Sequence, residues 1–174
     1  EKNNKLIDRF KNRLIFPIFD YNNKVIGFGG RALSQNYLAK YINSPETEFF
    51  KKGFNLYNLN NAKNENKQSG IVFVVEGYMD AISLYQAGFK NVVATLGTAM
   101  TESHLNLVWR YFNDPVVCFD GDRSGQNAAH KISEKLIAYM KPNYSLSFLI
   151  LPNGFDPDSF VRKNGRNNFE SLLD

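Results

Sequence analysis

The sequence has 174 residues, 43% of them hydrophobic and 14% aromatic, which suffices for one good-sized domain or two small ones with a real core. No apolar run approaches the roughly 18 residues of a membrane span, and the given sequence does not open on a signal-peptide pattern. A single cysteine, Cys118, excludes an internal disulfide, and with two histidines a structural zinc site is not expected. We therefore expect a cytoplasmic protein without a membrane partner.

The net charge of +4 is unevenly distributed along the chain. Residues 1–66 hold 11 Lys and Arg against 6 Asp and Glu, a balance of +5, whereas residues 67–174 hold 10 against 11, a balance of −1. A basic half favours a polyanionic partner. An ordinary solvated surface explains the same charge equally well.

The first part of the chain reads as β-rich. The segments RLIFPIFD (13–20) and KVIGFGGRA (24–32) flank the turn-forming residues 21–23, which predicts a β-hairpin. Gly27, Gly29 and Gly30 predict a bulge or a close backbone approach in the second strand. Residues 54–63 favour a short helix, and the polar run NENKQSG (64–70) is the natural domain boundary.

From residue 71 onward the pattern changes. Four short apolar runs, 71–75, 92–96, 116–119 and 146–151, alternate with amphipathic helical patterns in 78–88, 101–112 and 126–140. Thr101 is a plausible N-cap of the second of these helices. Continuous apolar strands that alternate with helices are typical of a parallel sheet covered on both faces.

Acidic residues follow three of the four predicted strands. Glu76 follows the first, Asp120-Gly121-Asp122 follows the third, and the segment with Asp156 and Asp158 follows the fourth. Ligands of open α/β sheets bind outside these carboxyl ends, and residues two apart in an extended segment point the same way. Clustered carboxylates without His or Cys nearby favour Mg²⁺ or Mn²⁺, and paired ions of this kind serve phosphoryl and nucleotidyl transfer.

Each carboxylate also has a structural interpretation. A single Asp at a strand end is usually a helix N-cap or a turn residue. Asp80 could complement the dipole of the helix that starts near residue 78, and Asp156 and Asp158 could form a turn before the last helix. We interpret His104 and His130, which fall within predicted helices, as structural residues, and Cys118 as a residue of the core.

Glu76 after one strand and Asp120-Gly121-Asp122 after a later one resemble the TOPRIM module of bacterial primases, type IA and type II topoisomerases, small nucleases and recombination proteins. The surrounding segments resemble the bacterial primase version: EGYMDAISLYQAG (76–88), ATLGTAMT (94–101), CFDGDRSGQNAA (118–129) and LPNGFDPDSFVRKNG (151–165). The basic half resembles that family's own N-terminal subdomain in RLIFPIFD (13–20), VIGFGGRAL (25–33), KYINSPET (40–47) and FFKKGFNLYNL (49–59).

The resemblance implies an α/β fold, with a TOPRIM-type, Rossmann-like domain around a mostly parallel sheet in residues 67–174. A small basic α+β subdomain in residues 1–66 would precede it. The implied activity is the synthesis of short RNA primers on a DNA template by divalent-metal-dependent nucleotidyl transfer. The carried-over residues are Glu76 as catalytic acid and metal ligand, Asp120 and Asp122 as metal ligands, Asp80, Asp156 and Asp158 as supporting acidic residues, and Arg13, Arg31, Lys40 and Lys52 for nucleic acid or nucleotide.

The partners that the resemblance implies are a single-stranded DNA template, an RNA primer and ribonucleoside triphosphates, with Mg²⁺ or Mn²⁺ as cofactor. The family's zinc module and its helicase-docking module have no counterpart in this sequence, so we expect neither zinc nor direct contact with the replicative helicase. Two alternatives stay open. A TOPRIM nuclease or topoisomerase fragment would cleave phosphodiesters through the same acidic cluster, and a non-catalytic module would only bind nucleic acid.

Overall fold

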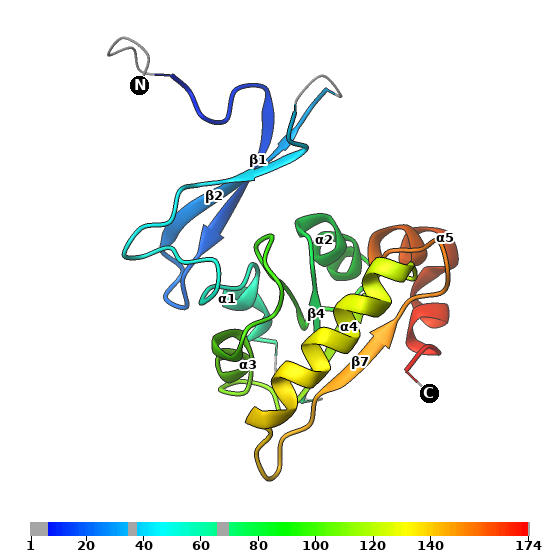
Figure 1. The fold of residues 1–174 in the computed structure, drawn as a ribbon. Coiled ribbons are helices and arrows are strands. Elements are labelled where there is room, and N and C mark those ends of the chain that lie inside the picture. Colours follow the sequence, from blue (N-terminus) through cyan, green and yellow to red (C-terminus); the bar gives the residue numbers. More distant parts are fainter. Residues whose placement is uncertain (1–6, 35–37, 66–69, 174) are drawn as a thin grey trace.

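The computed structural model describes residues 7–34, 38–65 and 70–173, which form two β-sheets flanked by helices (Figure 1). The first sheet is antiparallel, in the order β1 (Arg13–Phe19), β2 (Val25–Ala32) and β3 (Tyr41–Asn43). The predicted hairpin is therefore confirmed. The register between β1 and β2 shifts at Ile18 and Phe19, near the turn.

The helix predicted over residues 54–63 is shorter than expected. Only α1 (Leu59–Ala62) is helical, because Asn58 adopts a left-handed conformation with φ of 66° at its start. The predicted domain boundary between residues 66 and 67 lies outside the described residues.

The second sheet is entirely parallel, as predicted. Its strands are β4 (Ile71–Val75), β5 (Val92–Ala94), β6 (Asp114–Phe119) and β7 (Ser147–Ile150), in the order β5-β4-β6-β7. Four helices cover it: α2 (Tyr78–Gln86), α3 (Glu102–Val108), α4 (Arg123–Leu136) and α5 (Pro157–Glu170) (Figure 1). None of the described helices is long and apolar enough to cross a membrane.

Successive residues of β4 serve two separate cores. Val72 and Val74 pack with residues of α3 and α4, whereas Phe73 and Val75 pack with residues of α2 and α5. This alternation follows from the two-residue period of a strand, and it confirms a sheet buried on both faces. The described chain thus has the predicted α/β architecture.

The end of α4 differs from the prediction. The apolar stripe expected to run through Met140 stops at Leu136, and a 3₁₀ turn (Ile137–Tyr139) follows. Met140 is 41% exposed. Pro142 disfavours helical backbone at Lys141, the residue before it, so helical structure is not expected to continue beyond Met140 in any case.

The antiparallel sheet packs on the start of α2. The Tyr78 ring stacks on Phe16 with centroids 5.0 Å apart, and its hydroxyl donates a hydrogen bond of 2.6 Å to Asn43 Oδ1 on β3. A Cβ atom on Gly29 would lie 2.5 Å from the Tyr78 side chain, so the expected close backbone approach is real. Asn43 Nδ2 also donates to the Leu96 carbonyl (2.8 Å). These contacts place β3 beside the carboxyl edge of the parallel sheet.

Candidate active site

Three of the predicted carboxylates line one cavity. Glu76, Asp120 and Asp122 meet around a volume of about 460 Å³ at the carboxyl ends of β4 and β6. The loop after β5 and the first turn of α4 supply the rest of its polar wall through Thr95, Gly97, Thr98, Ser124 and Gly125. The residues after the strands therefore converge as the strand order predicts, while their chemical roles stay predictions.

Two glycines allow the backbone turn that carries Asp120 and Asp122. A Cβ atom on Gly121 would lie 2.0 Å from the Pro152 carbonyl oxygen, and the Gly121 N–H donates to the Phe155 carbonyl (2.8 Å). A Cβ atom on Gly125 would lie 2.1 Å from the Asp120 carbonyl oxygen. The sequence indicated the need for Gly121, whereas the need for Gly125 follows only from the packing of α4 on this turn.

The carboxylates in the cavity perturb one another. Burial raises the pKa of Glu76, and the charges of Asp120 and Asp122 raise it further. The pKa of Asp120 is raised by burial, then by Asp156 and Asp122. Among the described residues, no Lys, Arg or His forms an ion pair with Glu76, Asp120 or Asp122. No side-chain cation of the described part of the protein thus offsets their mutual repulsion.

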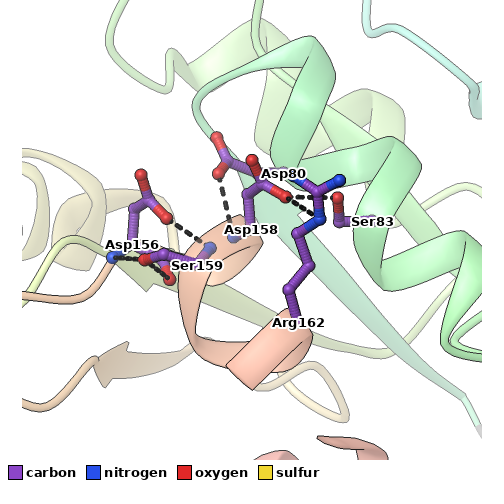
Figure 2. A network of polar contacts seen from close by, with 6 residues as sticks. All are labelled: Asp80, Ser83, Asp156, Asp158, Ser159 and Arg162. Atoms are coloured by element: carbon purple, nitrogen blue, oxygen red, sulfur yellow. Dashed lines mark hydrogen bonds and ion pairs between the residues drawn. The ribbon is translucent and has the colours of Figure 1, made fainter. Parts of the chain in front are cut away.

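The other acidic residues at this edge stabilise local structure (Figure 2). Asp156 is the N-cap of α5, and its Oδ1 accepts a hydrogen bond of 2.6 Å from the Ser159 N–H. Asp158 accepts from the Ser83 hydroxyl and pairs with Arg162, whose Nε lies 3.6 Å from its Oδ1. Asp156 and Asp158 do not line the cavity of Glu76.

Asp80 links α2 to α5 (Figure 2). Its two oxygens accept from the Gly77 N–H (3.1 Å) and the Asp158 N–H (3.2 Å). Burial raises the pKa of Asp80 to about 7, against the opposing effect of the Asp158 hydrogen bond, and the charges of Asp156 and Asp120 add to the rise. Asp80 is therefore about half ionised near neutral pH. It does not line the cavity, but the charge of Asp120 in the cavity raises its pKa.

The three carboxylates of the cavity differ in the hydrogen bonds that they accept. Asp122 is the N-cap of α4, and its Oδ1 accepts from the Gly125 N–H (2.7 Å). Within the described ranges, the carboxylates of Glu76 and Asp120 accept no hydrogen bond, since no backbone or side-chain donor reaches them. The N-cap interpretation therefore holds for Asp122 and Asp156, but it fails for Glu76 and Asp120.

The donor set suits a hard divalent cation. Carboxylate oxygens are the ligands that Mg²⁺ and Mn²⁺ prefer, and a cation would relieve the repulsion that raises these pKa values. In the described part of the chain, no three Asp, Glu, His or Cys side chains form a ready-made metal site. An ion at this edge would therefore be held partly through water, as Mg²⁺ usually is.

The basic residues of the antiparallel sheet fall into different environments. Arg31 on β2 pairs in register with Leu14 and Tyr41, on the same face as Gly29 and hence toward the parallel sheet. Burial raises the pKa of Tyr41; the Arg31 charge lowers it, and the charges of Asp80, Asp158 and Asp156 raise it. Arg31 and Tyr41 thus lie at the seam between the basic sheet and the acidic edge.

Arg13 is occupied by backbone contacts. Its guanidinium donates to the carbonyl oxygens of Ala39 (2.8 Å), Lys40 (3.3 Å) and Gly30 (3.4 Å), and so ties β1 to the chain that enters β3. The Lys40 ammonium lies 5.7 Å from the centre of the Tyr41 ring. The nucleic-acid role predicted for these residues stays a prediction.

Hydrogen bonds to its backbone groups hold Lys52 in place. Its carbonyl oxygen lies 2.7 Å from His104 Nε2, and its N–H donates to Glu46 Oε1 (2.9 Å). His104 Nδ1 accepts from the Thr101 N–H, so Nε2 carries the proton and donates to Lys52. His104 is completely buried, and burial lowers its pKa. The structural interpretation of His104 and the N-cap predicted at Thr101 are both confirmed.

Two family descriptions match the chain. Residues 1–63 match the DNA primase catalytic core, N-terminal domain, and residues 73–161 match the Toprim-like family. A DNA primase of Clostridium acetobutylicum is 48% identical over 174 residues, which make up 100% of this chain and 28% of that protein. The chain spans 28–29% of the length of such curated DNA primases.

Solved structures agree with these matches. A DNA primase domain from Pseudomonas aeruginosa has a TM-score of 0.92 and 43% identity to this chain, and the similarity covers 99% of this chain and 53% of that one. The DnaG primase catalytic domain bound to ssDNA has a TM-score of 0.88 and 46% identity, over 95% of this chain and 53% of that one. The resemblance seen in the sequence extends through both sheets, and the chain belongs to the DNA primase family, as a part of the catalytic core that includes its Toprim-like domain.

Proposed function

We propose that this chain is the nucleotidyl-transferring part of a primase, which joins ribonucleoside triphosphates into a short RNA primer on single-stranded DNA. The observation that carries the proposal is the cavity lined by Glu76, Asp120 and Asp122, where two carboxylates have no hydrogen-bonding task in the described structure. Membership of the DNA primase family supports the choice of reaction.

Glu76, Asp120 and Asp122 would hold Mg²⁺ or Mn²⁺, surrounded by the supporting acidic residues Asp80, Asp156 and Asp158. When bound, such an ion would supply positive charge to the phosphate under attack. Asp120 and Asp122 follow the same strand, so the turn at Gly121 and Gly125 fixes both against the sheet. This rigid placement is what a site that positions a triphosphate requires.

Glu76 has a further role in this proposal. Its carboxylate has no competing hydrogen bond within the described residues, so it can accept a proton as well as contact an ion. It would accept the proton that the primer 3′-hydroxyl loses as that oxygen attacks the α-phosphate of the incoming nucleotide, whose bond to the β-phosphate breaks to release pyrophosphate. Because Glu76 is exposed at the mouth of the cavity, the proton can pass to water.

The basic subdomain, residues 1–66, would hold the template and the incoming nucleotide beside the catalytic domain, residues 67–174. Arg31 lies at the seam, and Lys40 and Lys52 lie on segments anchored by Arg13 and His104. Their cations would neutralise phosphates of the strand. A related catalytic domain is described as bound to ssDNA, which supports this partner.

One incubation separates this function from its alternatives. The chain is mixed with a single-stranded template annealed to a short RNA primer, ribonucleoside triphosphates, and Mg²⁺ or Mn²⁺. Extension of the primer is the expected result. Strand cleavage without extension would instead identify a TOPRIM nuclease or topoisomerase fragment, and binding with neither reaction would identify a non-catalytic module.

A further inference from the structure

A second hollow lies beside α3, apart from the carboxylate cavity. It has a volume of about 360 Å³, and residues 19–21, 54–59 and 103–110 contribute its lining. These segments are the end of β1 with the hairpin turn, the chain that leads into α1, and one face of α3 with the turn after it (Figure 1). This α3 hollow shares no lining residue with the carboxylate cavity.

The α3 hollow has an apolar floor and an aromatic rim. Leu56 and Leu59 form the floor and are 2% and 5% exposed, whereas Phe54 and Tyr21 line the hollow with 61% and 59% of their surface exposed. One exposed hydrophobic residue needs no explanation, but here two exposed aromatic rings from separate segments meet at one hollow. An apolar pocket bordered by exposed aromatic residues is typical of the anchor sites of protein interfaces.

Three cations surround the α3 hollow. Arg110 lines it and is exposed. The Lys63 ammonium donates a hydrogen bond to the Tyr21 carbonyl, and the Lys141 ammonium donates to Asn106 Oδ1 (2.7 Å), so both are held by residues of the lining. None of the three forms an ion pair with a carboxylate of the described residues.

Two carboxylates belong to the same surface, and both have local partners. Asp20 lines the hollow, and its Oδ1 accepts from the Asn22 N–H (2.8 Å) and the Lys24 N–H (2.9 Å), which closes the hairpin turn. Glu102 Oε1 accepts from Asn106 Nδ2 at 3.5 Å. Three cations thus face two carboxylates that already accept hydrogen bonds, and this balance favours an anionic ligand.

We propose that the α3 hollow docks an acidic peptide segment of a partner protein. One apolar side chain of the peptide enters the hollow between Phe54 and Tyr21, and carboxylates beside it pair with Arg110, Lys63 and Lys141. Charge complementarity and the apolar floor select this occupant together, since neither an uncharged nor a wholly polar ligand would use both. The inference goes beyond the proposed function, because the hollow has no lining residue in common with the cavity where synthesis would occur.

The hydrogen bonds of the lining favour a peptide over nucleic acid. Asn55 Oδ1 accepts from the Lys51 N–H (2.9 Å). Asn106 uses both ends of its amide, as a donor to Glu102 and as an acceptor from Lys141. These amide groups are therefore engaged and do not offer the edge contacts by which a base is recognised. The aliphatic floor suits the apolar side chain of a peptide.

The test is an NMR titration of the isotope-labelled chain with a synthetic peptide that carries Leu and Phe between two pairs of Asp. Backbone amide shifts should be confined to residues 19–21, 54–59 and 103–110, with a Kd of about 1 mM or below. Two control peptides, one with Lys in place of Asp and one with Gly in place of Leu and Phe, should bind at least about tenfold more weakly. A single-stranded oligonucleotide is titrated in parallel.

Variants of the chain locate the contact. Arg110→Glu should weaken binding of the acidic peptide at least about tenfold, and Phe54→Ser about fivefold. Lys163→Glu is the matched control and should bind like wild type, since it makes the same charge change on an exposed residue of α5, which packs on the other face of the parallel sheet. Thermal unfolding of each variant confirms that the fold is intact.

Three results would overturn the inference. The first is the absence of shifts at the α3 hollow with the acidic peptide, or equal shifts with the basic one. The second is equal peptide affinity in Arg110→Glu and Lys163→Glu. The third is an oligonucleotide that shifts the same amides at lower concentration than the peptide does, which would assign the hollow to nucleic acid.

Discussion

Two groups of carboxylates lie at the same edge of the parallel sheet and differ in what they do there. Asp80, Asp156 and Asp158 accept hydrogen bonds from α2, α5 and Ser83, and one of them pairs with Arg162 (Figure 2). Glu76 and Asp120 accept none within the described residues, yet they line the cavity. An acidic motif alone therefore does not separate candidate ligands from structural residues; the place of each carboxylate relative to the cavity and the hydrogen bonds that it already accepts are both needed.

The largest effect is expected from the cavity group. Asp120→Ala should lower primer synthesis at least about a hundredfold, because it removes charge at the position where the reacting phosphate and its cation would meet. Thermal stability without metal should be unchanged or higher, since a repelling carboxylate is removed. Initial rates of extension and thermal melting measure both effects. Glu76→Gln should be comparably severe, and near-normal activity in Asp120→Ala would contradict the metal-binding role.

The turn that carries the cavity group is expected to be the most sensitive structural position. Gly121→Ala places a Cβ 2.0 Å from a backbone oxygen, so the backbone must move, at a cost of about 3 kcal/mol in unfolding free energy. Gly53→Ala is the matched control, since its Cβ would meet only a Thr101 methyl at 3.8 Å. Urea unfolding compares the two. A Gly121→Ala variant as stable as Gly53→Ala would show that the turn is free to adjust.

A smaller loss is expected in the structural group. Asp156→Ala removes the N-cap of α5 and should lower the unfolding free energy by about 1 kcal/mol, while Asp156→Ser restores most of it. Primer synthesis should fall far less than in Asp120→Ala. The comparison of the two groups breaks down if Asp156→Ala leaves stability unchanged and abolishes synthesis as fully as Asp120→Ala.

The last prediction concerns the pH dependence of stability. The folded protein holds the Asp80 proton more tightly than the unfolded chain does, since burial raises the pKa from an ordinary 3.8 to about 7. The unfolding free energy should therefore fall as the pH rises between these values, in the absence of metal. Asp80→Asn removes the titrating proton, keeps an acceptor for one of the Gly77 and Asp158 N–H groups, and should flatten this dependence. Urea unfolding across the pH range, compared with wild type, would contradict the account if the slopes were equal.

Much of this architecture could be predicted from the sequence. The alternation of short continuous apolar runs with helical patterns predicted the parallel sheet, and its strand ends placed Glu76, Asp120 and Asp122 at one edge. The sequence could not separate Asp156 from Asp120, because an N-cap and a metal ligand both follow strands as isolated acidic residues. The need for Gly125 was also missed, since it depends on how α4 packs against the turn after β6.

The most direct test of the central claim is the position of Mn²⁺ in crystals of the chain soaked in MnCl₂ and located by anomalous scattering. The account predicts ions within about 2.2 Å of carboxylate oxygens of Glu76, Asp120 or Asp122, with water completing their coordination. Ions bound only to Asp80, Asp156 or Asp158, with the cavity carboxylates unligated at saturating Mn²⁺, would contradict it.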